Sequence, residues 1–395
     1  MGESVLISVI FLFQNMKKLI FFELYLYAMT TSDLYYTLAL LKVEGVGDIV
    51  AKKLIHHCGS AEQVFSAKKK QLFAIDGVGE MLYRNLQNTY VFDLAKSELD
   101  FIENQNIDFS FYQEEHYPER LKHCIDGPVV LFQSGAINLQ RQKLISIVGT
   151  RQVTSYGADF CRKLIEDLAP LNPVIVSGFA YGVDIIAHQS AIDCGLQTVG
   201  VLAHGLNQIY PKIHKRYIAK MEQNGGFLTE FWSSSSPERE NFIKRNRIVA
   251  GMSEATIVIE SAEKGGSLIT ANIANDYNRD VFAVPGRSSD KYSQGCNNLI
   301  KTQRAHLLTS AADVVYMLNW ELEEKAVKPI QKQLFISLDA EEQKIYDFLQ
   351  KNGKELLDSI AFECEFPIFK ISSLLLNMEL KGVIRPLPGK LFEAI

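Results

Sequence analysis

Two short segments gather cations and aromatic rings in a chain whose formal net charge is -5. Residues 210–216 are Tyr-Pro-Lys-Ile-His-Lys-Arg, and residues 241–247 are Asn-Phe-Ile-Lys-Arg-Asn-Arg. Local positive charge on a net-negative protein predicts a confined site for a polyanion. The rings of Tyr181, Tyr210 and Phe242 could stack on unpaired bases, which contributes about 1–3 kcal/mol per base. The alternative is a solvated basic helix face whose rings lie in the core.

Three glycine-rich turns could bring backbone N–H groups close to a phosphate. They are Gly-Thr-Arg at 149–151, Ser-Gly-Phe-Ala-Tyr-Gly-Val-Asp at 177–184 and Lys-Gly-Gly-Ser at 264–267. Glycine permits close approach of the backbone, and a helix N-terminus favours negative charge. The chain contains neither G-x-G-x-x-G after the first apolar run nor G-x-x-x-x-G-K-[ST]. This argues against a dinucleotide-dependent dehydrogenase, and it means that the chain has no P-loop for ATP hydrolysis.

The pair Asp184 and His188 could suggest acid–base catalysis, but neither a nucleophile nor a metal-binding partner accompanies it in the sequence. We therefore expect these residues to brace their loop, and we expect no catalysis, no metal and no cofactor. The six cysteines form no C-x-x-C pair. This predicts neither a zinc site nor a disulfide framework, and it favours the reducing cytoplasm.

Apolar runs alternate with helix-length segments from residue 144 onwards. Runs of this kind are typical of strands buried on both faces, so we predict an α/β fold with a Rossmann-like, doubly wound and mainly parallel sheet. In such folds ligands bind outside the carboxyl ends of the strands, where the turns above lie. The predicted strands are 144–148, 174–176, 198–203, 255–259 and 281–284, and the predicted helices are 154–169, 183–194, 213–224 and 267–278.

A length of 395 residues predicts two to three domains at about 150 residues each. Residues 1–28 are apolar but are interrupted by Lys17, Lys18 and Glu23, so neither half is long enough to span a bilayer. We expect this segment to be a non-native N-terminal extension. The expected domains are a helical helix-hairpin-helix domain at 29–110, a Rossmann-like domain at 111–320, a linker at 321–338 and a winged-helix domain at 339–395.

The two flanking domains carry weaker signals for nucleic acid. Turns at 44–47 and 76–79 share a Gly-Val-Gly pattern that suits either phosphate contact or a plain helix–helix turn. The winged-helix segment contains 10 acidic and 7 basic residues, and its recognition helix offers only Lys370 and Lys381. This favours a structural or protein-contact role over duplex DNA binding.

Six motifs in fixed order resemble the DprA/Smf family of bacterial DNA processing proteins. They are GTR at 149–151, SGFAYGVDIIAH at 177–188, YPK at 210–212, FIKRNRIVAG at 242–251, KGGSLITA at 264–271, and PG followed by G-x-N-x-L-I within 285–300. The resemblance extends over about residues 35–395. Two departures are Gly265, where the family usually has serine, and Asn207, where it usually has aspartate.

The resemblance implies a homodimer that binds single-stranded DNA without sequence preference and promotes RecA loading in natural transformation or recombination, with no membrane or metal involved. The residues that would neutralise phosphates are Arg151, Lys212, Lys244, Arg245 and Arg247. Those that would let the backbone approach the strand are Gly149, Ser177, Gly178, Gly182 and Gly266. The expected DNA-binding set also includes Thr150, Phe179, Tyr210, Phe242, Asn246, Lys264 and Ser267.

Two alternatives belong to other functional classes. Related Rossmann-like enzymes of the phosphoribohydrolase type cleave nucleotides with a P-G-G-x-G-T-x-x-E loop, but Ala271 and Asn272 stand here where that glutamate would be. A duplex-DNA-binding regulator would use the winged helix, whose acidic balance argues against it.

Overall fold

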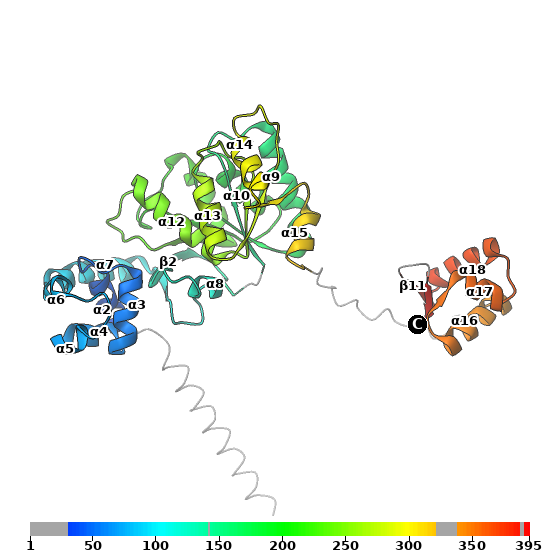
Figure 1. The fold of residues 1–395 in the computed structure, drawn as a ribbon, viewed down its shortest axis with the longest axis horizontal. Coiled ribbons are helices and arrows are strands. Elements are labelled where there is room, and N and C mark those ends of the chain that lie inside the picture. Colours follow the sequence, from blue (N-terminus) through cyan, green and yellow to red (C-terminus); the bar gives the residue numbers. More distant parts are fainter. Residues whose placement is uncertain (1–30, 141–142, 321–337, 388–390) are drawn as a thin grey trace, which may run out of the picture. The chain divides into compact units, whose positions relative to one another are not determined.

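The computed structural model describes residues 31–140, 143–320, 338–387 and 391–395. The chain forms two compact units, Met1–Leu322 and Glu323–Ile395 (Figure 1). The expected extension at 1–28 and nearly all of the expected linker at 321–338 lie outside the described residues. Among the described residues, no helix is both long enough and apolar enough to cross a bilayer.

A nine-stranded sheet forms the centre of the first unit, in the order β1-β2-β6-β5-β4-β3-β7-β8-β9. Strands β3 to β9 are parallel, while β1 and β2 pair antiparallel at one edge. This confirms the predicted α/β, mainly parallel sheet. The strands are β1 (Asp108–Phe111), β2 (Val130–Gly135), β3 (Leu144–Val148), β4 (Val174–Ser177), β5 (Thr198–Val201), β6 (Gly225–Thr229), β7 (Ala255–Val258), β8 (Asp280–Ala283) and β9 (His306–Leu307).

Helices cover both faces of this sheet. In β3, Leu144 and Val148 belong to the core on one face, whereas Ile145 and Ile147 belong to the core on the other. This two-sided burial explains the unbroken apolar run. The first core includes residues of α12 (Arg239–Met252), α13 (Ser267–Asp276) and α14 (Gln294–Lys301), and the second includes residues of α9 (Ser155–Leu168), α10 (Val183–Asp193) and α15 (Ala311–Met317).

The segment predicted as one helix at 213–224 is a 3-10 helix, η2 (Lys212–Tyr217), followed by α11 (Ile218–Gln223). The short elements η1 (Ala169–Leu171) and α8 (Glu119–Lys122) complete the α/β part. The chain leaves β3 toward one side of the sheet and later returns through β7 on its other side. The sheet therefore has a topological switch point between β3 and β7, where α/β folds form a crevice.

An N-terminal helical layer packs against the β1–β2 end of the sheet within the same unit. Its core includes Val129, Val130 and Phe132 from the β2 region, together with Trp232. At the two Gly-Val-Gly turns, Gly45 and Gly77 have φ values of 87° and 88°, a left-handed conformation that favours glycine. The helices are α2 (Thr31–Leu41), α3 (Asp48–Cys58), α4 (Ala61–Ser66), α5 (Lys69–Leu72), α6 (Glu80–Leu86) and α7 (Tyr90–Gln105).

The second unit has its own hydrophobic core and the predicted winged-helix layout. Three helices and a small sheet of order β10-β12-β11 follow one another, and Asp339 caps the first helix by accepting from the N–H groups of Glu341 and Glu342. The elements are α16 (Ala340–Asn352), β10 (Glu355–Leu356), α17 (Leu357–Glu363), α18 (Ile368–Leu380), β11 (Ile384–Leu387) and β12 (Leu391–Ala394).

Candidate nucleic-acid interface

A groove of about 740 Å³ opens at the carboxyl ends of β3, β4 and β7. It lies at the topological switch point, where this fold class places its ligands. The groove collects ten members of the expected DNA-binding set from segments that are far apart in sequence. These are Gly149, Thr150, Arg151, Gly178, Phe242, Arg245, Asn246, Lys264, Gly266 and Ser267.

Three exposed cations surround the groove. Arg151 follows β3, Arg239 begins α12, and Lys264 precedes α13. Within the described ranges, none of the three takes part in an ion pair. The only carboxylate that lines the groove among the described residues is Asp184, which is buried. The groove therefore keeps an uncompensated positive charge that a polyanion can neutralise.

One wall of the groove is aromatic. The guanidinium of Arg151 lies 5.4 Å from the centroid of the Phe242 ring, a cation–π contact. The Tyr210 ring meets Phe242 edge to face at 5.8 Å and keeps 41% of its surface exposed. A partly exposed ring beside a cation suits the stacking of an unpaired base next to its phosphate.

Two helices begin at the groove, and their partial positive N-terminal charge adds to that of the side chains. Helix α10 starts after Gly182, and α13 starts after Gly266. Gly182 has a φ of 76°, and a Cβ there would lie 2.2 Å from the Thr150 carbonyl oxygen. A Cβ at Gly149 would lie 2.5 Å from Val183. Close packing of the first two turns therefore requires these glycines.

Several predicted residues support the groove from beneath rather than line it with an exposed side chain. The guanidinium of Arg245 is only 4% exposed and donates to the Val201 carbonyl at 2.5 Å. Burial lowers the pKa of Arg245 to about 10, while Asp184 opposes this effect. Phe179 is buried, and the Ser177 hydroxyl donates to the Ile147 carbonyl at 2.6 Å. In this structure, therefore, the Arg245 guanidinium is already engaged and the Phe179 ring is covered, so neither presents a free surface to a nucleic acid.

The Arg245 guanidinium packs directly against Gly178, which lines the groove. A Cβ at Gly178 would lie 2.2 Å from Arg245 Nη1, so Gly178→Ala must displace a buried guanidinium. We expect this variant to lose about 1–3 kcal/mol of unfolding free energy, the usual cost of overpacking, and to bind DNA more weakly. Gly266→Ala is the matched control, because a Cβ there meets nothing within 4 Å. Urea unfolding that ranks the two variants equally would contradict this account.

Asp184 and His188 make separate contacts. The carboxylate of Asp184 accepts from the Ala180 N–H at 3.2 Å, which fastens the turn at 177–184. His188 is fully buried, and its Nδ1 shares a hydrogen bond of 2.7 Å with the Thr198 hydroxyl. Burial raises the pKa of Asp184, against the effect of Arg245, and lowers that of His188 to about 3. These hydrogen bonds are consistent with a role in holding the turn at 177–184 and helix α10 in place.

The lowered pKa of His188 makes stability depend on pH. In the unfolded chain, His188 has a pKa of about 6.5. Between this pH and about pH 3, His188 is protonated in the unfolded chain but neutral in the folded chain. Stability therefore falls by about 1.4 kcal/mol for each pH unit below 6.5. Between pH 7 and pH 5 the wild type should lose about 2 kcal/mol more unfolding free energy than His188→Gln. Parallel curves for the two proteins would refute this assignment.

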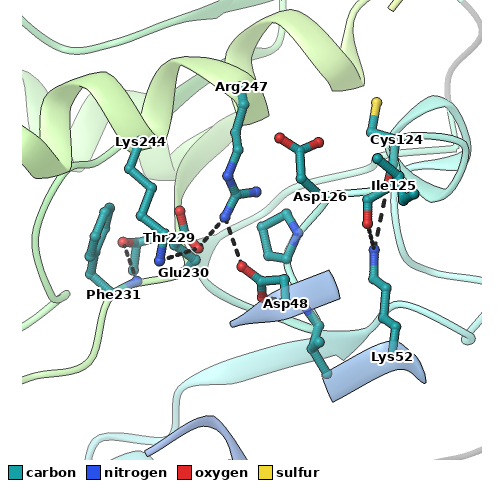
Figure 2. A network of polar contacts seen from close by, with 12 residues as sticks. Asp48, Lys52, Cys124, Ile125, Asp126, Thr229, Glu230, Phe231, Lys244 and Arg247 are labelled. Carbon is teal, nitrogen blue, oxygen red and sulfur yellow. Dashed lines mark hydrogen bonds and ion pairs between the residues drawn. The ribbon is translucent and has the colours of Figure 1, made fainter. Parts of the chain in front are cut away.

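Arg247 and Lys244, two members of the expected DNA-binding set, lie outside the groove. Both face the helical layer, and Glu230 accepts from both, at 2.5 Å from Arg247 and 3.4 Å from Lys244 (Figure 2). Arg247 also contacts Asp48 at 3.0 Å and is only 7% exposed. Buried between two carboxylates, Arg247 cannot neutralise a phosphate without breaking these pairs.

The same network fastens the first Gly-Val-Gly turn to the α/β part. Asp48, the first residue of α3, also accepts from the Val129 N–H at 3.0 Å. On the next turn of α3, Lys52 Nζ lies 3.4 Å from the Cys124 carbonyl oxygen (Figure 2). Of the two interpretations left open for this turn, the structure favours a structural role at residues 44–47.

Lys212 is exposed on η2 and does not line the groove, although its neighbour Tyr210 touches Phe242. Residues that line the groove but are absent from the sequence-based set include Gln152, Arg239, Ile243 and Thr270. Arg239 precedes Phe242 by three positions on α12, so helical spacing could have identified it.

Comparison with known proteins shows the family to which this chain belongs. Residues 108–319 match the family model of DNA recombination-mediator protein A, and residues 332–390 match the DprA winged helix domain. The chain belongs to the DNA recombination-mediator protein A (DprA) family. The predicted family and winged-helix domain are thus confirmed, and the chain is a DNA-processing protein involved in DNA recombination.

Individual relatives are similar to this chain over most of its length. Protein Smf of Escherichia coli is 33% identical over 74% of this chain and 79% of its own length. Protein Smf of Synechocystis is 34% identical over 69% of each chain. The X-ray structure of DNA processing protein A from Streptococcus pneumoniae covers 71% of this chain and 97% of its own, with 31% identity and a TM-score of 0.60.

Proposed function

We propose that this DprA-family chain binds single-stranded DNA without sequence preference in the groove between β3 and β7. The observation that carries the proposal is a set of three groove cations, Arg151, Arg239 and Lys264, that form no ion pair with any described residue. The partly exposed rings of Phe242 and Tyr210 accompany them. The cations neutralise phosphates and the rings accept bases, and neither interaction depends on base identity.

Unpaired bases are central to this proposal, because bases in a duplex are stacked on one another and cannot stack on Phe242. Fluorescence anisotropy of labelled oligo-dT against a duplex of equal length tests the preference at two salt concentrations. We expect tighter binding of oligo-dT and an affinity that falls with salt for both. Equal or tighter binding of the duplex would reject the proposal.

We also propose that the chain acts in the cytoplasm as a homodimer and promotes loading of RecA onto the bound strand. Support comes from membership in the family of recombination mediators. Sedimentation equilibrium tests the dimer. RecA filament formation on single strands coated with single-strand-binding protein tests the loading, which should occur sooner when this chain is present. An unchanged lag would remove RecA loading from the proposed function.

We propose that the groove is not catalytic. Among the described residues that line it, the sole carboxylate is the buried Asp184, whereas nucleotide cleavage of the phosphoribohydrolase type requires an accessible glutamate after the glycine turn. Incubation with nucleoside monophosphates should release no ribose 5-phosphate. Release that disappears in Asp184→Asn would bring the enzyme alternative forward.

The winged helix is not expected to supply duplex binding. Lys370 is paired with Glu341 and Lys381 with Glu342, each at 2.5 Å, so each of these lysines already has an ionic partner within its own unit. We expect Lys370→Ala with Lys381→Ala to leave the affinity for duplex DNA, and its salt dependence, unchanged in the anisotropy assay. A shallower salt slope would show that these lysines contact phosphates.

A further inference from the structure

A second cluster of cations lies next to the groove, on the 3-10 helix η2. Lys212, Lys215 and Arg216 are exposed there, and none of them forms an ion pair with any described residue. None of the three lines the groove, so binding within the groove leaves this positive charge without a role. Local positive charge of this kind on a net-negative chain attracts a polyanion.

The period of a 3-10 helix explains why these cations are exposed. Side chains three positions apart lie on the same side of such a helix. The buried His214 and the partly buried Tyr217 form the side of η2 that packs inward. Lys212 and Lys215 then share an exposed side, and Arg216 lies on the third. A rise of about 2 Å per residue places Lys212 and Lys215 about 6 Å apart along the axis, a separation that adjacent phosphates of an extended strand can match.

Two contacts fasten η2 to the walls of the groove. Nδ1 of His214 donates to the Phe179 carbonyl oxygen at 3.1 Å, and both neighbours of Phe179 in the chain line the groove. Just before η2, the Tyr210 ring meets Phe242 of the groove at 5.8 Å. The helix η2 therefore continues directly from the groove, and a strand that passes Tyr210 can reach the cations of η2.

Tyr181 adds an exposed ring on this side. It follows Ala180, which lines the groove, but Tyr181 does not line the groove itself and keeps 45% of its surface exposed. The rings of Tyr181 and His214 meet edge to face at 5.2 Å, so Tyr181 lies against η2. An exposed ring beside exposed cations offers the two contacts that a nucleotide needs, stacking for the base and positive charge for the phosphate.

We propose that Tyr181, Lys212, Lys215 and Arg216 form a second nucleotide-binding surface, on which a single strand continues after it leaves the groove. This inference rests on the proposed binding of single-stranded DNA in the groove. Neither phosphate contact nor ring stacking depends on base identity, so the surface lengthens the binding site without adding a sequence preference. Strands that are too short to leave the groove do not reach it.

Titrations of the full-length chain with oligo-dT of increasing length, from about 4 to about 16 nucleotides, test this surface. Lys215→Ala combined with Arg216→Ala should bind the shortest oligonucleotide as the wild type does, and the longest about tenfold more weakly. With the longest strand alone, the slope of log K against log salt should become shallower by about 0.7 for each lost contact. Arg162→Ala with Lys163→Ala removes an adjacent pair of exposed cations from α9. This matched control should bind every length as the wild type does.

The ring is tested in the same series. Tyr181→Leu removes the stacking surface and should weaken binding of the longest strand by about tenfold, with no change for the shortest. Tyr181→Phe keeps the ring and should bind every length as the wild type does. Equal losses in the two variants at the longest length would show that the ring does not stack on a base.

Two results would overturn the second surface. One is an affinity of the Lys215 and Arg216 double variant that equals the wild-type value at every length. The other is an equal loss at every length, including the shortest, which would make η2 part of the groove's own binding site. Both results leave binding in the groove intact. A wild type that binds no oligo-dT of any length would instead reject the proposed function, and this surface with it.

Discussion

Arg151→Ala combined with Lys264→Ala is expected to weaken binding of single-stranded DNA by about a hundredfold at moderate salt. Both side chains line the groove, and no ion pair occupies either of them in the described part of the chain. A hydrogen bond to a charged group contributes about 1.5–3 kcal/mol, and each 1.4 kcal/mol corresponds to a factor of ten. Removal of each phosphate-binding charge should also make the slope of log K against log salt shallower by about 0.7.

Lys244→Ala is the control for this pair. It removes a positive charge from the same region of the sequence, but Lys244 lies outside the groove and is paired with Glu230. We expect a change in affinity of less than about threefold, as for most exposed ion pairs. Titrations of oligo-dT at several salt concentrations measure both quantities. If Lys244→Ala lowers the affinity as much as the double variant, the DNA lies on the opposite side of α12.

Arg247→Met is expected to cost about 3–5 kcal/mol of unfolding free energy, because it leaves the buried carboxylate of Glu230 with only the half-exposed Lys244, 3.4 Å away, as an ionic partner. Burial raises the pKa of Glu230 and the nearby Arg247 opposes that rise, so loss of the arginine leaves an unfavourable buried charge. Asp48 would lose the same partner, and the packing of α3 against α12 would weaken.

Urea unfolding measures this loss of stability, and two further variants serve as comparisons. Arg162→Ala breaks an exposed pair with Asp159 and should cost less than about 1 kcal/mol. Adding Glu230→Gln to Arg247→Met should recover part of the stability, because the poorly paired buried charge is then absent. A salt slope of DNA binding that stays at the wild-type value would show that Arg247 positions α12 rather than contacts phosphate. A cost equal to that of Arg162→Ala would contradict the buried network.

The strands that could be predicted are those whose residues are apolar on both faces. β3, β4, β5, β7 and β8 were found in this way. The sequence pattern does not indicate β6, because this strand begins with Gly225 and Gly226, and glycine is a residue type that does not predict a strand. Both residues have positive φ values, 139° and 149°, which favour glycine at these positions. The two-residue β9 is too short to form a pattern.

The residues that the structure gathers in the groove follow from the sequence where a turn carries them, but not where a helix does. Gly149 to Arg151 and Lys264 to Ser267 lie at strand ends, so topology alone brings them together. On α12, neighbouring residues point in different directions. Phe242 and Asn246 face the groove while Lys244 and Arg247 face the helical layer, and nothing in the local sequence indicates which side is which.

Photo-cross-linking tests most directly the claim that the strand lies in the groove. An oligonucleotide containing 5-iodouracil would be irradiated with the full-length chain, and the modified peptide identified by mass spectrometry. The account predicts an adduct on Phe242 or Tyr210, whose rings are partly exposed near Arg151, and its loss in Arg151→Ala with Lys264→Ala. An adduct confined to α18 or to the turn at 76–79, with none in the groove, would contradict it.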